Sequence, residues 1–154
     1  MVDLADVVLK YYFHPYMKGS YSIKVVLPSV QNSSDLIKSK YLLPVYGTTE
    51  MPSLNHTEPK VWTVFGEDGM VKNPYKLLPP ISSYLDTDID LDNVEIKETE
   101  SVANGGAALA AYAKMQFSDG AMSEALEKSL LTYCELDTLV MVFIWEYFWN
   151  ESRK

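Results

Sequence analysis

The segment TYCELDTLVM, residues 132–141, lies in the most apolar part of the chain and decides how its fold is interpreted. Ser123 is placed to cap a helix that we expect to run from Glu124 to about Trp149. The densest apolar run of this helix, Leu139 to Trp145, contains no charged residue. We therefore expect one side of the helix to form the core of a mostly helical domain.

This helix carries a carboxylate on the side expected to face the core. At about 100° per residue, Asp137 and Tyr133 lie opposite the solvent face. That solvent face is marked by Lys128, Thr132 and Glu146, and the core face by Val140, Met141 and Ile144. Because an unpaired buried carboxylate is costly, Asp137 needs a metal ion, a cation or several hydrogen-bond donors. The alternative is a structural Asp137 that hydrogen-bonds a loop, with Tyr133 as an ordinary core residue.

The two ends of the sequence also have helical patterns. A short helix with one apolar face is expected over residues 4–13, with Asp3 as its N-cap. The pair His14-Pro15 should end this helix. A second helix is expected at about residues 21–30, capped by Ser20 or Ser22. A third follows Asn104, another suitable cap, and is broken at residues 118–120. These patterns predict a mostly α fold with a minor β component (α+β).

Residues 31–100 differ from both ends, because they hold six of the eight prolines and show weak helical periodicity. Alternating residues predict a β-hairpin near residues 60–72. The remainder is expected to be an ordered loop that holds Tyr41, Tyr46 and Tyr75 against the core. A loop of this length is usually functional or an insertion. We therefore expect one partial domain over residues 1–154, with residues 31–100 inserted into it.

Charge and composition exclude several classes of protein. The net charge is −8, and residues 81–100 alone contribute −6, which does not fit a protein that holds duplex DNA by neutralising phosphates. The single cysteine, Cys134, excludes an internal disulfide and a cysteine-rich zinc site, and we expect it to be a small core residue. No run approaches the roughly 20 apolar residues of a membrane span. The N-terminus is acidic rather than basic, so we expect a cytoplasmic protein.

Two further segments have patterns of known sites. DTDIDLD, residues 86–92, alternates acids like a calcium loop, but Leu91 and Lys97 stand where glycine and glutamate are required. A solvated acidic loop is the better interpretation. NGGAAL, residues 104–109, lacks the Gly-Lys-Ser/Thr ending of a phosphate-binding loop, so a capped, closely packed helix is expected there.

Longer segments resemble a known class of nucleases. Tyr133-Cys134-Glu135-Leu136-Asp137 resembles the Tyr-x-x-x-Asp motif of the DEDDy class of 3′–5′ exonucleases, which includes ribonuclease D and polymerase proofreading domains. The segments YYFHPYMKGSYSIKVVLPS, NGGAALAAYAKMQF and LLTYCELDTLVM resemble a bacterial family, domain of unknown function 2779, whose members carry an exonuclease-like domain. The resemblance covers nearly the whole chain.

The resemblance implies a ribonuclease H-like fold and two-metal hydrolysis of a nucleic-acid phosphodiester. Asp137 would be a metal ligand and Tyr133 would orient the attacking water. The two ions would be Mg²⁺ or Mn²⁺, which prefer hard oxygen ligands. The first two acidic motifs of the class are absent, and a single carboxylate cannot build a two-metal site. The chain is therefore expected to be a C-terminal fragment or truncated relative that is inactive alone and needs the missing N-terminal half of the domain.

Two functions thus remain for this chain. In the first, it is part of an exonuclease, and Lys18, Ser20, Tyr21 and Lys24 line a path for single-stranded nucleic acid, with Tyr21 as a stacking platform. For these residues the alternative is a helix cap flanked by solvated lysines. In the second, the chain is a non-catalytic helical interaction module. Its acidic residues 86–100 would then attract a basic partner.

Overall fold

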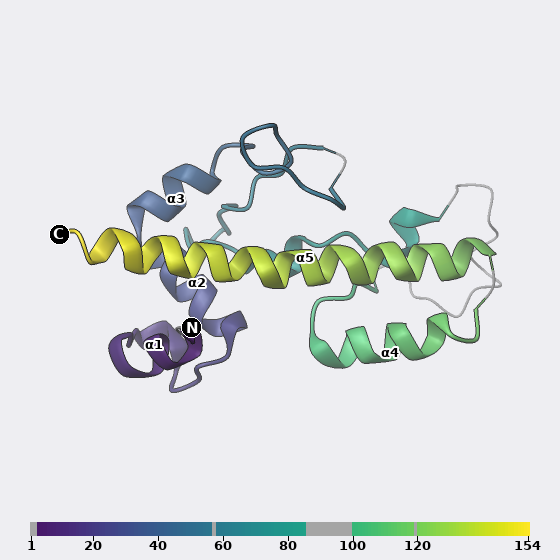
Figure 1. Ribbon diagram of the computed structural model, residues 1–154, viewed down its shortest axis with the longest axis horizontal. Helices are drawn as coiled ribbons and strands as arrows, with labels where there is room; N and C mark the ends of the chain where they lie inside the picture. Colours follow the sequence, from purple (N-terminus) through teal and green to yellow (C-terminus); the bar gives the residue numbers. More distant parts are fainter. Residues whose placement is uncertain (1–2, 57, 86–99, 119) are drawn as a thin grey trace. The chain divides into compact units, whose positions relative to one another are not determined.

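The computed structural model describes residues 3–56, 58–85, 100–118 and 120–154. The helices in these ranges are α1 (Leu4–Tyr11), α2 (Ile23–Ser33), α3 (Asp35–Tyr41), α4 (Gly105–Met115) and α5 (Gly120–Glu151) (Figure 1). Three 3₁₀ turns accompany them: η1 (Pro15–Met17), η2 (Pro74–Leu77) and η3 (Ile81–Tyr84). The predicted mostly α class is confirmed. Among the described residues, no helix combines the length and apolarity that a bilayer crossing requires.

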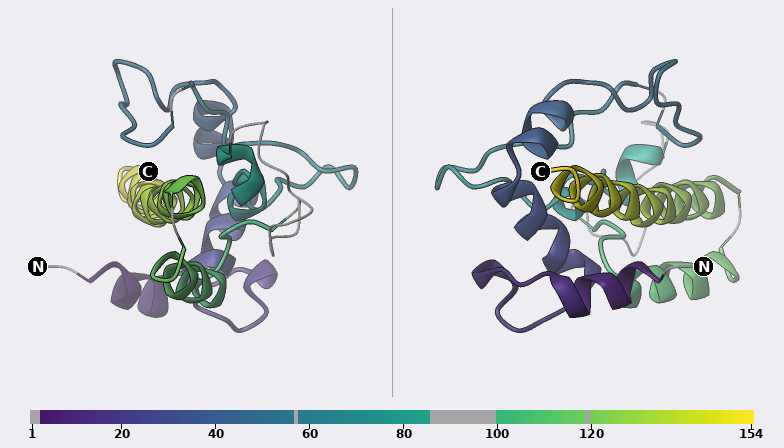
Figure 2. Two further views of the ribbon diagram at one scale, coloured as in Figure 1. Left: turned by 90° about the vertical axis from the view of Figure 1, so that its right-hand side faces the viewer. Right: turned by 60° about the vertical axis from the view of Figure 1, so that its left-hand side comes forward.

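Side-chain caps start three of the helices. The carboxylate of Asp3 accepts a hydrogen bond from the Ala5 amide at 2.9 Å, and the side chain of Asn104 accepts one from Ala107 at 2.9 Å. Both caps were predicted from the sequence. Ser34 is the one residue between α2 and α3, and its hydroxyl caps α3 by accepting a hydrogen bond from the Ile37 amide (Figure 2). Each cap satisfies a backbone N–H that has no partner within its helix.

Helix α2 continues through Pro28 instead of ending near it. A proline inside a helix cannot donate to the carbonyl four residues earlier, which here belongs to Lys24. The side-chain amide of Asn73 donates to that carbonyl at 3.1 Å and replaces the missing bond. The helix therefore reaches Ser33, three residues beyond the predicted end. Ser22 occupies the N-cap position of α2 but makes no side-chain capping bond.

The predicted β-hairpin near residues 60–72 is wrong in its extent. One antiparallel bridge joins Phe65 to Val71 around a turn, and the described residues here form no named strand. Backbone groups that a longer hairpin would pair are used elsewhere. The amides of Trp62 and Thr63 both donate to the Tyr41 carbonyl, at 3.0 and 2.9 Å, and the Val71 amide donates to the side chain of Asn32.

Residues 31–100 also contain helix α3, which the sequence analysis missed. The segment has only seven residues, too few to show a helical period clearly. The expected burial of Tyr41, Tyr46 and Tyr75 is confirmed, but Tyr41 ends α3 and Tyr75 lies in η2 rather than in a loop.

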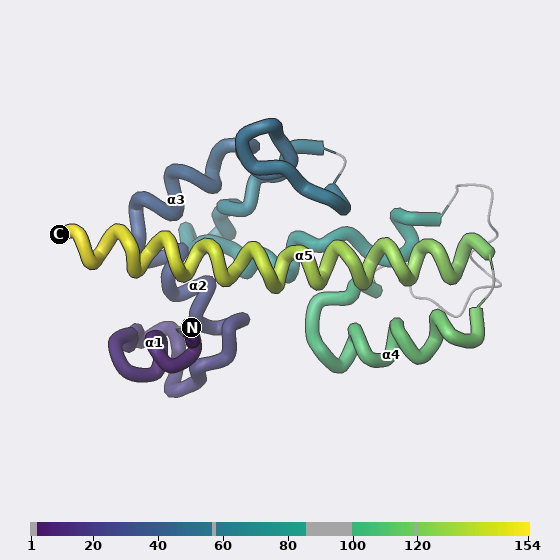
Figure 3. Tube along the Cα trace, viewed as in Figure 1, coloured from purple at the N-terminus to yellow at the C-terminus, as the bar shows by residue number. Residues whose placement is uncertain are grey.

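The chain forms two compact units, each with its own core. Unit 1 comprises Met1–Pro74 and Asp137–Lys154, and unit 2 comprises Tyr75–Leu136. The largest fully buried side chains of unit 1 are Met17, Leu27, Ile37, Tyr41, Trp62 and Phe143. The buried side chains of unit 2 include Tyr75, Ile81, Val102, Ala125, Leu126, Tyr133 and Leu136. Helix α5, with 32 residues, is one unbroken helix that contributes to both cores (Figure 3).

Candidate functional site

Tyr133 and Asp137 lie one turn apart on α5, as the sequence predicts, but they have different surroundings. Tyr133 is 7% exposed, and its ring centroid lies 6.0 Å from that of Tyr75 at an angle of 52°. Both residues belong to the core of unit 2. The surroundings of Tyr133 are therefore those of a packed core residue, which was the alternative interpretation of this side chain.

Asp137 is half-buried and begins the part of α5 that belongs to unit 1. Its carboxylate lies close enough to Lys24, on α2, to act on the charge of that ammonium group. Burial lowers the pKa of Lys24 below its ordinary value, and the negative charge of Asp137 opposes this by raising it. Lys24 is therefore a cation within the electrostatic reach of Asp137.

The four residues predicted to line a nucleic-acid path lie in one short segment of unit 1. Lys18, Ser20 and Tyr21 are exposed, and Lys24 is half-buried in the first turn of α2. Lys18 has a left-handed backbone, with φ of 49°, at the end of η1. The fully buried Met17 anchors this turn, and its carbonyl accepts a hydrogen bond from Ser20 at 2.9 Å.

Exposed aromatic rings precede these four residues in the sequence, and the sequence analysis did not assign them a role. Tyr11, Phe13 and Tyr16 are 77%, 75% and 50% exposed. The Tyr16 ring stacks on His14, with centroids 4.8 Å apart, and its hydroxyl donates to the Met70 sulfur at 3.4 Å. The density of rings in YYFHPY, residues 11–16, was the signal that could have identified them.

The orientation predicted for α5 is correct for some residues and wrong for others. Val140 and Ile144 are buried, as expected, but Met141 is about half exposed. Thr132, assigned to the solvent face, is buried, and its hydroxyl accepts a hydrogen bond from Tyr84 at 3.1 Å. Cys134, expected in the core, is exposed. Both halves of α5 bury the same side of the helix, which is turned by about a quarter turn from the predicted one.

Glu146 was also assigned to solvent, and it joins α3 to α5 in unit 1. Its carboxylate accepts a hydrogen bond from the Tyr41 hydroxyl at 3.0 Å and forms an ion pair with Lys40. Burial raises the pKa of Tyr41 far above its ordinary value, and the negative charge of Glu146 raises it further. Tyr41 therefore stays protonated and donates to Glu146 over the whole neutral range.

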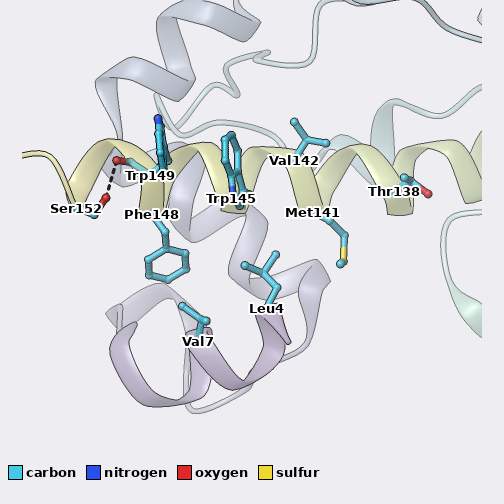
Figure 4. A pocket seen from close by; sticks show the side chains of 9 residues that line it. All are labelled: Leu4, Val7, Thr138, Met141, Val142, Trp145, Phe148, Trp149 and Ser152. Carbon is cyan, nitrogen blue, oxygen red and sulfur yellow. Dashed lines mark hydrogen bonds between the residues drawn. The ribbon is translucent and has the colours of Figure 1, made fainter. Parts of the chain in front are cut away.

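An apolar groove lies between α1 and α5 in unit 1. Its volume is about 620 Å³, and its lining residues are Leu4, Val7, Thr138, Met141, Val142, Trp145, Phe148, Trp149 and Ser152 (Figure 4). Trp145 and Trp149 stack with ring centroids 5.4 Å apart, at 16°. The guanidinium of Arg153 lies 4.1 Å from the Trp149 ring centroid. The groove is therefore apolar along its length and has a cation at one end.

The described part of the chain does not by itself fit a metal centre. Among these residues, no group of three or more His, Cys, Asp and Glu side chains could hold a metal ion. Asp137 offers one carboxylate, and two-metal chemistry requires several. The calcium-like segment 86–92 lies outside the described residues.

Comparison with protein-family models, curated proteins and solved structures gave no match to this chain.

Proposed function

We propose that this chain is the helical part of a metal-dependent 3′–5′ exonuclease domain and that it binds single-stranded nucleic acid through residues 10–24. Asp137 would serve as a metal ligand, and Tyr133 would orient the attacking water, once the missing acidic motifs are supplied. Mg²⁺ or Mn²⁺ would then be the cofactor. The observation that carries the proposal is the surface of residues 10–24, which combines exposed aromatic rings with lysines.

The charge of this surface differs from that of the chain as a whole. Between Asp6 and Asp35 there is no acidic residue, whereas Lys10, Lys18 and Lys24 contribute +3 to a chain of net charge −8. Lysines attract phosphates, and exposed rings stack on bases that are not already stacked in a duplex. This combination favours a single strand over a double helix.

Packing holds this surface in a defined shape. Met17 anchors the turn, His14 stacks on Tyr16, and the Tyr12 hydroxyl shares a hydrogen bond with Ser33 at 3.3 Å. Preorganised rings lose less conformational entropy when they bind than mobile ones. Lys24 links this surface to α5, because its ammonium lies within the electrostatic reach of Asp137. A strand bound along residues 10–24 would therefore pass near the proposed metal ligand.

Binding can be tested by fluorescence anisotropy with labelled single-stranded DNA and RNA oligonucleotides and a duplex control, at about 50 mM salt. Tyr21→Ala should weaken single-strand binding about tenfold. Lys18→Ala should weaken it and reduce its salt dependence by the contribution of about one phosphate. The matched controls are Tyr112→Ala on α4, which has similar exposure, and Lys76→Ala on η2. Equal losses in test and control variants, or stronger duplex binding, would count against the proposal.

Catalysis is tested separately. With Mn²⁺ and a labelled single strand, the chain alone should release no product, because only one carboxylate of the site is present. Digestion that depends on Mn²⁺ and disappears in Asp137→Asn would show that this chain completes a metal site with its own residues. That outcome would contradict the fragment interpretation while leaving the binding surface intact.

A non-catalytic helical interaction module is the second candidate, and the burial of Tyr133 against Tyr75 favours it. Its proposed acidic surface, residues 86–100, lies almost wholly outside the described residues. For such a module, Tyr133→Phe and Asp137→Asn should leave the activity of a complemented nuclease domain unchanged. For the exonuclease, each substitution should abolish it.

A further inference from the structure

The segment MVKN, residues 70–73, is held against the proposed nucleic-acid surface by two side-chain hydrogen bonds. The hydroxyl of Tyr16 donates to the Met70 sulfur at 3.4 Å. The side-chain amide of Asn73 donates to the Lys24 carbonyl at 3.1 Å. The segment therefore lies along this surface between its two contacts, although it is distant from the surface in the sequence.

The side chain between these contacts belongs to Lys72, and the backbone geometry sets the side to which it points. Val71 forms an antiparallel bridge across the turn, so the backbone is extended there. Val71 is 5% exposed, and its amide donates to the side chain of Asn32 at 2.9 Å. Successive side chains of an extended segment point to opposite sides. Met70 and Lys72 therefore share the side opposite Val71, and from that side Met70 contacts Tyr16.

The charge of Lys72 is open to solvent. Its side chain is exposed, and within the part of the chain that the structure describes it forms no ion pair. The acids nearest in the sequence, Glu67 and Asp68, stand at the tip of the same turn. The Asp68 carboxylate accepts a hydrogen bond from the Met70 amide at 3.0 Å, which holds it at the turn. The ammonium of Lys72 is thus accessible to an anion.

We propose that Lys72 binds a phosphate of the single strand and is a fourth cation of the nucleic-acid surface. The inference rests on the proposed function. Single-strand sites combine rings that stack on bases with cations that follow the phosphates. Residues 10–24 supply the rings and three lysines, and Lys72 adds a cation from a second segment of unit 1. Glu67, exposed at the tip of the turn, would repel a phosphate that came near it.

The test is the salt dependence of single-strand binding, measured by fluorescence anisotropy between about 50 and 200 mM salt. Lys72→Ala should weaken binding about fivefold at the lowest salt and reduce the slope of log K against log salt by about 0.7, the contribution of one phosphate. Lys72→Arg should keep both, and Glu67→Gln should strengthen binding. Lys76→Ala removes an equally exposed lysine of unit 2, is the matched control and should change nothing. Circular dichroism checks that each variant is folded.

A double variant separates this inference from the proposed function. Lys18→Ala and Lys72→Ala together should multiply the two losses and reduce the slope by about 1.4. If Lys18→Ala weakens binding while Lys72→Ala behaves like Lys76→Ala, the inference is overturned and the proposed function stands. A loss in Lys72→Ala that is equal at all salt concentrations also overturns the inference, because a phosphate contact is screened by salt. A wild-type chain that binds no single strand overturns both.

Discussion

The two halves of α5 bury different proportions of their apolar surface. In the N-terminal half, which belongs to unit 2, apolar residues such as Leu126 and Leu136 are buried, while Glu127 and Lys128 face solvent. In the C-terminal half, Val140 and Phe143 are buried in unit 1, yet Met141, Trp145 and Trp149 remain about half exposed. The N-terminal half is thus an ordinary amphipathic helix, whereas the C-terminal half has apolar residues on two sides. The C-terminal half therefore leaves large apolar side chains exposed on the side opposite its buried residues.

Tyr133 and Asp137, the proposed catalytic pair, lie on either side of the boundary between the two halves of α5. Tyr133 belongs to the buried pattern of the N-terminal half, and the half-buried Asp137 begins the C-terminal half. If the C-terminal half has the functional role, then changes at Asp137 should affect binding, and changes at Tyr133 should mainly affect stability. The predictions below separate the two halves, in decreasing order of expected effect.

Phe143→Ala should have the largest effect on the free energy of unfolding. This side chain is fully buried, and its ring centroid lies 3.7 Å from that of Tyr41. Removing a buried phenylalanine ring costs about 4 kcal/mol through lost burial and a residual cavity. Urea denaturation measures the change. Phe117→Ala, at a residue 91% exposed, is the control, with an expected change below about 0.5 kcal/mol. Equal effects would show that this side of the C-terminal half is not a core.

Leu136→Ala tests the N-terminal half in the same way. Leu136 is fully buried, and its truncation should cost about 3 kcal/mol. Leu131→Ala, at a half-exposed position of the same helix, should cost much less. If the two variants lose the same stability, the amphipathic description of the N-terminal half is wrong.

Glu146→Ala should cost about 2 kcal/mol, because it leaves the buried Tyr41 hydroxyl without its acceptor. Glu127→Ala, at an exposed position of the N-terminal half, is the control and should be nearly neutral.

The same contact predicts a pH dependence. Folding raises the pKa of Tyr41, so the folded state retains a proton that the unfolded chain releases above about pH 10. The stabilisation is therefore complete below about pH 10 and is lost as the pH rises above it. Thermal melts between pH 8 and pH 11 should show this loss, and Tyr41→Phe should reduce its slope. An unchanged slope would mean that other groups cause the alkaline transition.

The smallest effect is expected from Asp137→Asn. The charge of Asp137 raises the pKa of Lys24, so its removal should lower that pKa further from its ordinary value. NMR titration of the lysine side chains measures this shift, and Glu127→Gln should leave it unchanged. If Lys24 titrates identically in the two variants, then the two halves of α5 do not differ in their electrostatic link to α2.

Local signals in the sequence predicted much of the fold. Asp3 and Asn104 were identified as caps because each precedes a helical pattern and can satisfy backbone N–H groups. The predicted helix at about residues 21–30 already included Pro28, but the contact that replaces the missing hydrogen bond could not be predicted, because Asn73 is distant in the sequence. The hairpin prediction failed for a related reason: the Tyr41 carbonyl takes the amides of Trp62 and Thr63.

The candidate site was less predictable than the fold. The sequence pointed to Asp137 as a carboxylate that needs a cation, but only tertiary structure places Lys24 near it. A helical wheel gives the relative positions of residues around α5, but not which side of the helix the cores bury. Thr132 and Met141 were misassigned for that reason. The resemblance to DEDDy exonucleases stays a prediction.

The most direct test of the account is an amide NMR titration of the full chain with a short single-stranded oligonucleotide. We expect resonance changes at residues 10–24 and around Asp137, where the C-terminal half of α5 begins, and none between Leu126 and Thr132 in the N-terminal half. Such a map would place the strand on the lysine-rich aromatic surface beside the proposed metal ligand. Changes confined to unit 2, or no changes at saturating oligonucleotide, would contradict the proposed function.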